Sequence, residues 1–165
     1  MEFDFQKAVG SVTHHCIGDA LSSQGVEPSY VKLLQNLYRD QTASVKTDKV
    51  STPFNIQTGT KQGDPLSSLL FNSVSEHIMG QIQLNWKRKG MGVQLLSTSE
   101  TRLTNLRFAD DLISLVHSLS HVSTMIEDLC LAARQIGLEL HPKKTGLVVS
   151  YPERWVYLSH PPHSV

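Results

Sequence analysis

Two adjacent carboxylates, Asp110 and Asp111, stand inside the otherwise apolar stretch "NLRFADDLISLV". Burying a charge is costly unless it is paired or bound to a metal, so such a pair needs either solvent or a cation. Apolar residues alternate with other residues on both sides of the pair, which predicts a tight hairpin with the acids at its turn. A polar turn is one sufficient explanation, because Asp side chains readily hydrogen-bond nearby backbone.

A divalent metal site is the second explanation. Mg²⁺ prefers carboxylate oxygens and keeps several waters, so one or two carboxylates together with substrate phosphates can hold it. A third acid from another strand would suit a two-metal phosphoryl-transfer site. Asp4, in "EFDFQKA", is placed for that role, since it lies in a short predicted strand that leads into a helix. The residues alone leave both explanations open.

The bulk composition predicts one ordinary globular domain. The chain has 165 residues, 39% of them hydrophobic and 18% charged. Its 15 basic and 15 acidic residues balance, so net charge gives no argument for binding nucleic acid. Cys16 and Cys130 are too far apart to suggest a disulfide framework. With no apolar run of membrane-spanning length and no signal peptide, we expect an intracellular protein without a membrane partner, whose location the sequence does not name.

Helical and strand patterns alternate along the chain, with hairpins among them. Helices are predicted near residues 13–23, 27–40, 67–86 and 120–137, and strands at 1–5, 42–48, 52–58, 91–96, 101–108, 138–141 and 146–150. Ser120 or Ser123 is the predicted N-cap of the last helix, and Asp64 is predicted to cap the helix entered through Pro65. This order predicts an α+β fold with a ferredoxin-like antiparallel sheet.

Two other polar clusters have ordinary explanations. "HHC" at residues 14–16 has no second ligand cluster at zinc-site spacing, and adjacent helical residues point to different faces, so we expect no metal site there. Lys87, Arg88 and Lys89 could meet a nucleic-acid backbone, but a solvated basic turn is the favoured explanation.

Four segments, in order, resemble the motifs of reverse transcriptases of non-LTR retrotransposons of the LINE type. They are "DFQKAVGSV" from Asp4, "GTKQGDPLSSLLFN" from Gly59, "FADD" from Phe108 and "GLELHPKKT" from Gly137. Together they cover roughly residues 3–149, and four ordered matches are far more specific than one. The resemblance implies a polymerase palm over residues 1–150, with helices packed on one face of its sheet. Residues 151–165 would then be a C-terminal tail, in which Tyr157 resembles the start of a primer-grip region.

The resemblance also implies a metal-dependent chemistry and its ligands. Asp4 and Asp110 match the positions that ligate both metals in that family, and Asp111 matches the third acidic position. Two Mg²⁺ ions, with Mn²⁺ as a possible substitute, would activate the primer 3′-hydroxyl and neutralise phosphate charge. The implied partners are an RNA template, a DNA primer and a deoxynucleoside triphosphate.

The nucleotide side of the site is implied in the same way. Gln62 and Gly63 match a Gln-Gly pair that lies against the incoming nucleotide and the template. Lys143 or Lys144 matches a basic position near the triphosphate, although a solvated turn after Pro142 explains these lysines equally well. Val9 stands at the position that contacts the nucleotide sugar.

Some positions depart from the family pattern. Val9 replaces an aromatic residue that helps to exclude a 2′-hydroxyl, Gly10 replaces an Asp, and Ser68 replaces a Pro. The fingers and the thumb are largely missing, and a strand at the first residue suggests missing upstream sequence. Two hypotheses follow: a palm that retains polymerase chemistry as part of a longer element, or a truncated relic without independent activity.

Overall fold

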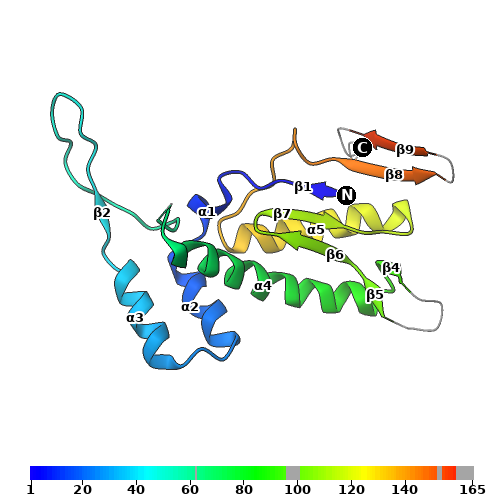
Figure 1. The fold of residues 1–165 in the computed structure, drawn as a ribbon, viewed down its shortest axis with the longest axis horizontal. Helices are drawn as coiled ribbons and strands as arrows, with labels where there is room; N and C mark the ends of the chain where they lie inside the picture. Colours follow the sequence, from blue (N-terminus) through cyan, green and yellow to red (C-terminus); the bar gives the residue numbers. More distant parts are fainter. Residues whose placement is uncertain (62, 96–100, 152–153, 159–165) are drawn as a thin grey trace. The chain divides into compact units, whose positions relative to one another are not determined.

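The computed structural model describes residues 1–61, 63–95, 101–151 and 154–158, in which helices and small antiparallel sheets follow one another (Figure 1). The mixed helix and strand content that the sequence predicted is therefore confirmed. The chain divides into two compact units. Unit 1 comprises residues 1–8 and 78–165, and unit 2 comprises residues 9–77.

The main sheet of unit 1 has the strand order β1-β7-β6 and is antiparallel throughout. Its strands are β1 (Glu2–Phe3), β6 (Asn105–Phe108) and β7 (Asp111–Ser114). Phe3 pairs with Leu112 in this register, and both side chains are buried, at 0% and 2% exposed. Leu106 and Ile113 form the next cross-strand pair and are exposed, so the sheet has one buried and one open face.

The core of unit 1 lies against the buried face of this sheet. Met125 and Leu129 of α5 (Leu119–Gln135) join Phe3 and Leu112 there, together with Trp86 from the last turns of α4 (Pro65–Arg88). The indole Nε1 of Trp86 donates a hydrogen bond to Asp128 Oδ2 at 2.9 Å, which satisfies the polar end of a fully buried ring.

The N-terminus of α5 differs from the prediction. Ser118 is the N-cap, with an extended backbone, and its Oγ accepts a hydrogen bond from the Ser120 amide. Ser120 and Ser123 were therefore wrong as caps, since both lie inside the helix. Three serines within six residues offer the same capping chemistry, and only the backbone conformation at residue 118 selects one of them.

Two further hairpins belong to unit 1. Strands β4 (Val93–Gln94) and β5 (Arg102–Leu103) form one, and β8 (Leu147–Tyr151) and β9 (Arg154–Leu158) form the other. The strand predicted over residues 138–141 was wrong, because this segment makes only a single bridge between Leu140 and Phe5. Pro142 follows directly and has no amide hydrogen to extend a ladder. The ferredoxin-like arrangement stays a prediction.

Unit 2 contains α2 (His14–Ser23) and α3 (Pro28–Tyr38), close to their predicted bounds. The short helix α1 (Ala8–Ser11) precedes them, and β2 (Thr42–Ala43) pairs with β3 (Phe54–Asn55) in the predicted hairpin. Helix α4 begins after Asp64, whose Oδ1 accepts a hydrogen bond from the Leu66 amide at 2.9 Å, so the predicted cap is confirmed. Among the described helices, none is long and apolar enough to cross a membrane.

Candidate functional site

The adjacent acids lie at the tight turn between β6 and β7. Phe108 pairs with Asp111 at the end of the hairpin, and Ala109 and Asp110 form the two-residue connection. Both acidic side chains are exposed, as the turn hypothesis and the metal hypothesis each require. Ala109 has a φ of 53°, a left-handed conformation that is uncommon for a residue with a Cβ atom. This turn therefore presents the acids to solvent on a constrained backbone.

Asp4 directly follows β1, the strand that pairs with this hairpin. Phe3 of β1 is registered with Leu112 of β7, and continuing that register by one residue leads to Asp4 and Asp111. The Asp4 carbonyl accepts a hydrogen bond from the His141 amide at 2.8 Å, so its backbone is held from the other side as well. The pairing of β1 with β7 thus brings the segment that ends in Asp4 alongside the strand that begins with Asp111, although the two acids lie more than 100 positions apart.

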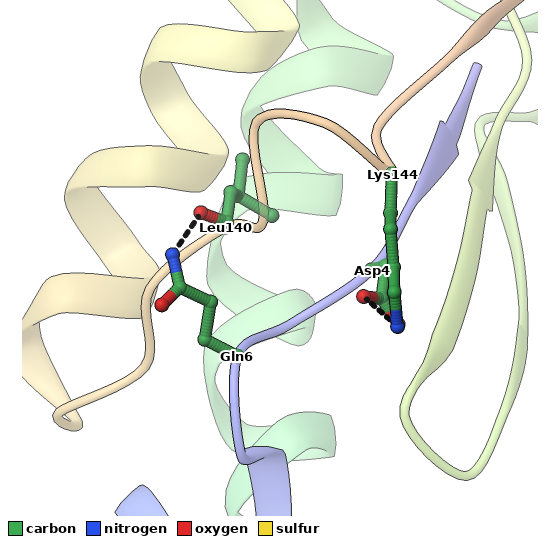
Figure 2. Close-up of polar contacts among 4 residues, drawn as sticks. All are labelled: Asp4, Gln6, Leu140 and Lys144. Carbon is green, nitrogen blue, oxygen red and sulfur yellow. Dashed lines mark hydrogen bonds and ion pairs between the residues drawn. The ribbon is translucent and has the colours of Figure 1, made fainter. Parts of the chain in front are cut away.

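The Asp4 carboxylate has a cationic partner. Figure 2 shows the Lys144 side chain extended over Asp4, with Nζ 3.3 Å from Oδ2. Gln6, two residues after Asp4, donates from Nε2 to the Leu140 carbonyl at 3.3 Å in the same view. The segment after α5 therefore lies along the chain around Asp4 and supplies its ion-pair partner.

Carboxylate donors of this kind suit a hard divalent cation. Mg²⁺ is commonly bound through one or two carboxylates, with waters and substrate phosphates completing its shell. Asp4 follows strand β1 of the main sheet and is only 26% exposed, and Asp110 lies in the turn between β6 and β7. Among the described residues, no group of three or more His, Cys, Asp or Glu side chains is gathered closely enough to hold a metal ion. The donor chemistry fits Mg²⁺, and the cation beside Asp4 in this structure is an ammonium.

In unit 2, Val9 lies beside the start of the glycine-containing loop. The Thr60 amide donates to the Val9 carbonyl at 3.0 Å, and the Gly59 amide donates to the Val12 carbonyl at 2.7 Å. Gly63 is exposed, with a φ of 90° that favours glycine, while Gln62 lies outside the described residues. The structure therefore brings Val9 and the start of this loop together.

Ser67 closes the other end of the loop. Its Oγ donates to the Lys61 carbonyl at 2.7 Å, and its amide donates to the Asp64 carbonyl at 3.0 Å. Ser67 is buried in the first turn of α4, so a rigid element fixes the backbone on both sides of Gly63.

His14 and Tyr38 support the same loop, and no pattern in the sequence predicts either role. His14 Nε2 lies 2.8 Å from the Gly59 carbonyl, and its ring packs on the Tyr38 ring at a centroid distance of 4.9 Å. Burial raises the pKa of Tyr38, and a hydrogen bond with Ser67 opposes that rise. The neighbouring His15 and Cys16 contact each other, with Nε2 3.2 Å from Sγ. Protein partners thus account for this polar cluster.

The remaining basic residues of the prediction are exposed. Lys87 and Arg88 occupy the last turn of α4, where positive charge favours a helix C-terminus, and Lys89 follows. Lys143 is exposed beside Lys144. Tyr157 lies in β9 of the terminal hairpin.

Comparison with known families gives an extended match. The profile of a family described as "Reverse transcriptase (RNA-dependent DNA polymerase)" matches residues 1–161. That range contains every candidate site residue discussed above.

Similar proteins come from insect retrotransposable elements. A Pol polyprotein of a type-1 element R2 from Popillia japonica is 29% identical over 90% of this chain. Pol polyproteins of R2DM from Drosophila melanogaster and of a type-1 R2 from Nasonia vitripennis are each 28% identical, over 86% and 98% of this chain. The chain spans only 24%, 13% and 16% of these three relatives, in the same order.

Proposed function

The chain belongs to the reverse transcriptase (RNA-dependent DNA polymerase) family, and on that premise we propose that it carries the catalytic palm of an RNA-directed DNA polymerase. The relatives named above are Pol polyproteins of R2 retrotransposable elements. The proposed reaction adds a deoxynucleotide to the 3′-hydroxyl of a DNA primer on an RNA template. The observation that supports the proposal is the antiparallel pairing of β1, which Asp4 follows, with β7, which begins with Asp111.

The proposed metal ligands are Asp4, Asp110 and Asp111. Two Mg²⁺ ions, or Mn²⁺ in their place, would lower the pKa of the attacking hydroxyl and neutralise the phosphates and the leaving pyrophosphate. The exposed turn at Ala109 supports this assignment, because strained backbone persists where surrounding structure fixes it and is common at functional sites. The protein's own contribution is to hold carboxylates at fixed positions in advance.

The proposed nucleotide contacts are Gln62, Gly63 and Val9, with Lys143 or Lys144 at the triphosphate. Glycine allows a ligand to approach the backbone closely, and a glutamine amide offers both donors and an acceptor. The hydrogen bonds from Thr60 to Val9 and from Ser67 to Lys61 support the proposal, since they fix the loop on both sides of Gly63. A lysine would act on phosphate as a compact positive charge.

The relic hypothesis is the alternative for this chain. Val9 lacks the ring that would pack under the sugar, so the proposed enzyme would discriminate weakly against a 2′-hydroxyl. Because the chain spans a quarter or less of the length of the three relatives above, template, integration target and further partners belong to the whole element.

Primer extension tests the proposed activity. The wild-type chain, Asp110→Asn and Asp19→Asn are assayed on an RNA template with a DNA primer and Mg²⁺ or Mn²⁺. Asp19 is an exposed acid of α2, so its substitution controls for the loss of one surface charge. Since loss of a group that merely supports a metal ligand costs 10–100-fold, Asp110→Asn should reduce extension by at least about 100-fold.

The outcomes separate the hypotheses. Extension that survives Asp110→Asn contradicts the metal-ligand assignment. Absence of extension by every chain, together with absence of Mn²⁺ binding by the wild type, favours the relic.

A further inference from the structure

The backbone around the Asp4–Lys144 ion pair is fixed on both partners. On the Asp4 side, the Gln6 amide donates to the Glu139 carbonyl at 2.8 Å and the His141 amide donates to the Asp4 carbonyl at 2.8 Å. Beyond the turn, Glu2 and Gly146 exchange backbone hydrogen bonds of 2.9 and 3.0 Å. The segment that carries Lys144 is therefore bound to the segment that carries Asp4 before and after the lysine.

The turn between these two anchors presents Lys144 toward Asp4. The Lys144 and Thr145 amides both donate to the His141 carbonyl, at 3.1 and 3.0 Å. Thr145 is buried at 5% exposed, while the Lys144 side chain is 64% exposed. The backbone is thus held while the ammonium can move, and Figure 2 shows that the ammonium lies over the carboxylate.

We propose that Lys144 is the resident cation of the metal site, neutralising Asp4 in the metal-free chain and leaving the carboxylate when a divalent ion binds. This inference rests on the proposed function, because it takes Asp4 as a metal ligand. The Lys144 ammonium and a divalent cation compete for the same carboxylate charge and repel each other at short range. The 3.3 Å separation between Lys144 Nζ and Asp4 Oδ2 is the observation that carries the proposal.

A divalent cation can readily replace the Lys144 ammonium at Asp4, because the ion pair is weak. Ion pairs with one mostly exposed partner contribute little, since water and salt screen them. Once displaced, the ammonium stays near the site, because its backbone is anchored at His141 and at Gly146. The same lysine is then available to phosphate, which links a counter-ion role in the empty site to the proposed triphosphate contact.

Mn²⁺ binding by the full chain, followed by the electron paramagnetic resonance signal of free Mn²⁺ without nucleotide, tests this inference. Lys144→Met removes the competing charge, so its Mn²⁺ affinity should exceed that of the wild type about three- to tenfold. Lys143→Met is the matched control, since it removes the same charge from the adjacent residue and should change affinity less than about twofold. Lys144→Arg keeps a cation and should bind like the wild type.

Two acid substitutions locate the effect. Asp4→Asn in the Lys144→Met background should abolish the gain in affinity. Equal affinities for Lys144→Met and Lys143→Met, or weaker binding by Lys144→Met, overturn the inference. If Lys144→Met and Lys143→Met bind Mn²⁺ equally while Asp110→Asn alone binds it more weakly than the wild type, the inference fails and the proposed metal site stands. Absence of Mn²⁺ binding by both the wild type and Lys144→Met overturns the inference and the metal site together.

Discussion

Ala109 has an unusual backbone conformation for its residue type, at the turn that carries the acidic pair. Its φ of 53° lies in the left-handed region, where the Cβ atom approaches the carbonyl oxygen. Asp110, the next residue, is the proposed ligand of both metals. The conformation of Ala109 therefore bears directly on where that carboxylate points.

Ala109→Gly should raise the free energy of unfolding by up to about 1.5 kcal/mol. Glycine removes a left-handed penalty of roughly 1–2 kcal/mol and returns about 0.5–1 kcal/mol as extra entropy of the unfolded chain. Ala109→Val should instead lower stability, because a β-branched side chain tolerates this region poorly. Urea unfolding of the three chains measures both effects. A glycine variant less stable than the wild type contradicts the assignment of strain.

Tyr38 predicts a pH dependence of stability. Burial raises its pKa above the ordinary value of 10.0, so the folded chain retains the phenol proton at a pH where the unfolded chain has lost it. The stability that the buried neutral phenol contributes is fully present below pH 10. It is lost as the pH rises from 10 through the raised pKa of the folded chain. Unfolding free energies measured at pH 9 and pH 11 should therefore fall more for the wild type than for Tyr38→Phe. Equal slopes of unfolding free energy against pH for the wild type and Tyr38→Phe contradict this role of Tyr38.

At the scale of elements, the loop with Gly63 depends on a close approach between two glycines. A Cβ atom added to Gly59 would lie 2.7 Å from the Gly10 carbonyl oxygen, whereas one added to Gly10 would meet nothing within 4 Å. Gly59 also has a φ of 85°, while Gly10 lies in helix α1. Glycine is thus required at position 59, where a side chain would clash, whereas position 10 has room for a side chain.

Alanine substitutions at these glycines should have opposite effects. Gly10→Ala should raise the free energy of unfolding by about 0.5–1 kcal/mol, because alanine favours a helix. Gly59→Ala should lower it by at least about 1 kcal/mol, because the new atom meets backbone and the φ is unfavourable. Denaturant unfolding of both variants tests the pair. If Gly59→Ala is as stable as Gly10→Ala, the close approach is wrong.

At the scale of the whole molecule, charge limits how tightly this chain alone can hold a nucleic acid. Its basic and acidic residues balance at 15 each, and phosphate contacts supply most non-specific affinity. We expect the chain to bind an RNA–DNA hybrid with a dissociation constant no tighter than about 10⁻⁶ M near physiological salt. Fluorescence anisotropy across a salt series measures both the affinity and its salt dependence.

The basic turn after α4 supplies a control for that measurement. If Lys87, Arg88 and Lys89 are solvated, replacing all three by alanine should leave the salt dependence unchanged. A fall in the logarithmic salt slope by about 2.7 would show three lost phosphate contacts and contradict the solvated turn.

Much of the local structure could be predicted from local signals. Alternating apolar residues predicted the hairpin around Asp110, and Asp64 before Pro65 predicted the cap of α4, since both depend on near neighbours. The predicted cap of α5 and the strand over residues 138–141 were wrong. The cap was wrong because several serines offered the same capping chemistry. The strand was wrong because Leu140 pairs with Phe5 through one bridge only.

The sequence by itself determined the family, the residue types of the proposed site and the turns that carry them, because motif order and turn chemistry are written in neighbouring residues. Only the tertiary structure decided which lysine faces Asp4 and which histidine holds Gly59. Lys143 and Lys144 are equivalent in composition and spacing, and a backbone turn anchored by contacts more than 100 residues away distinguishes them. Such long-range hydrogen bonds leave no periodic pattern in the chain, so the folded structure alone reveals them.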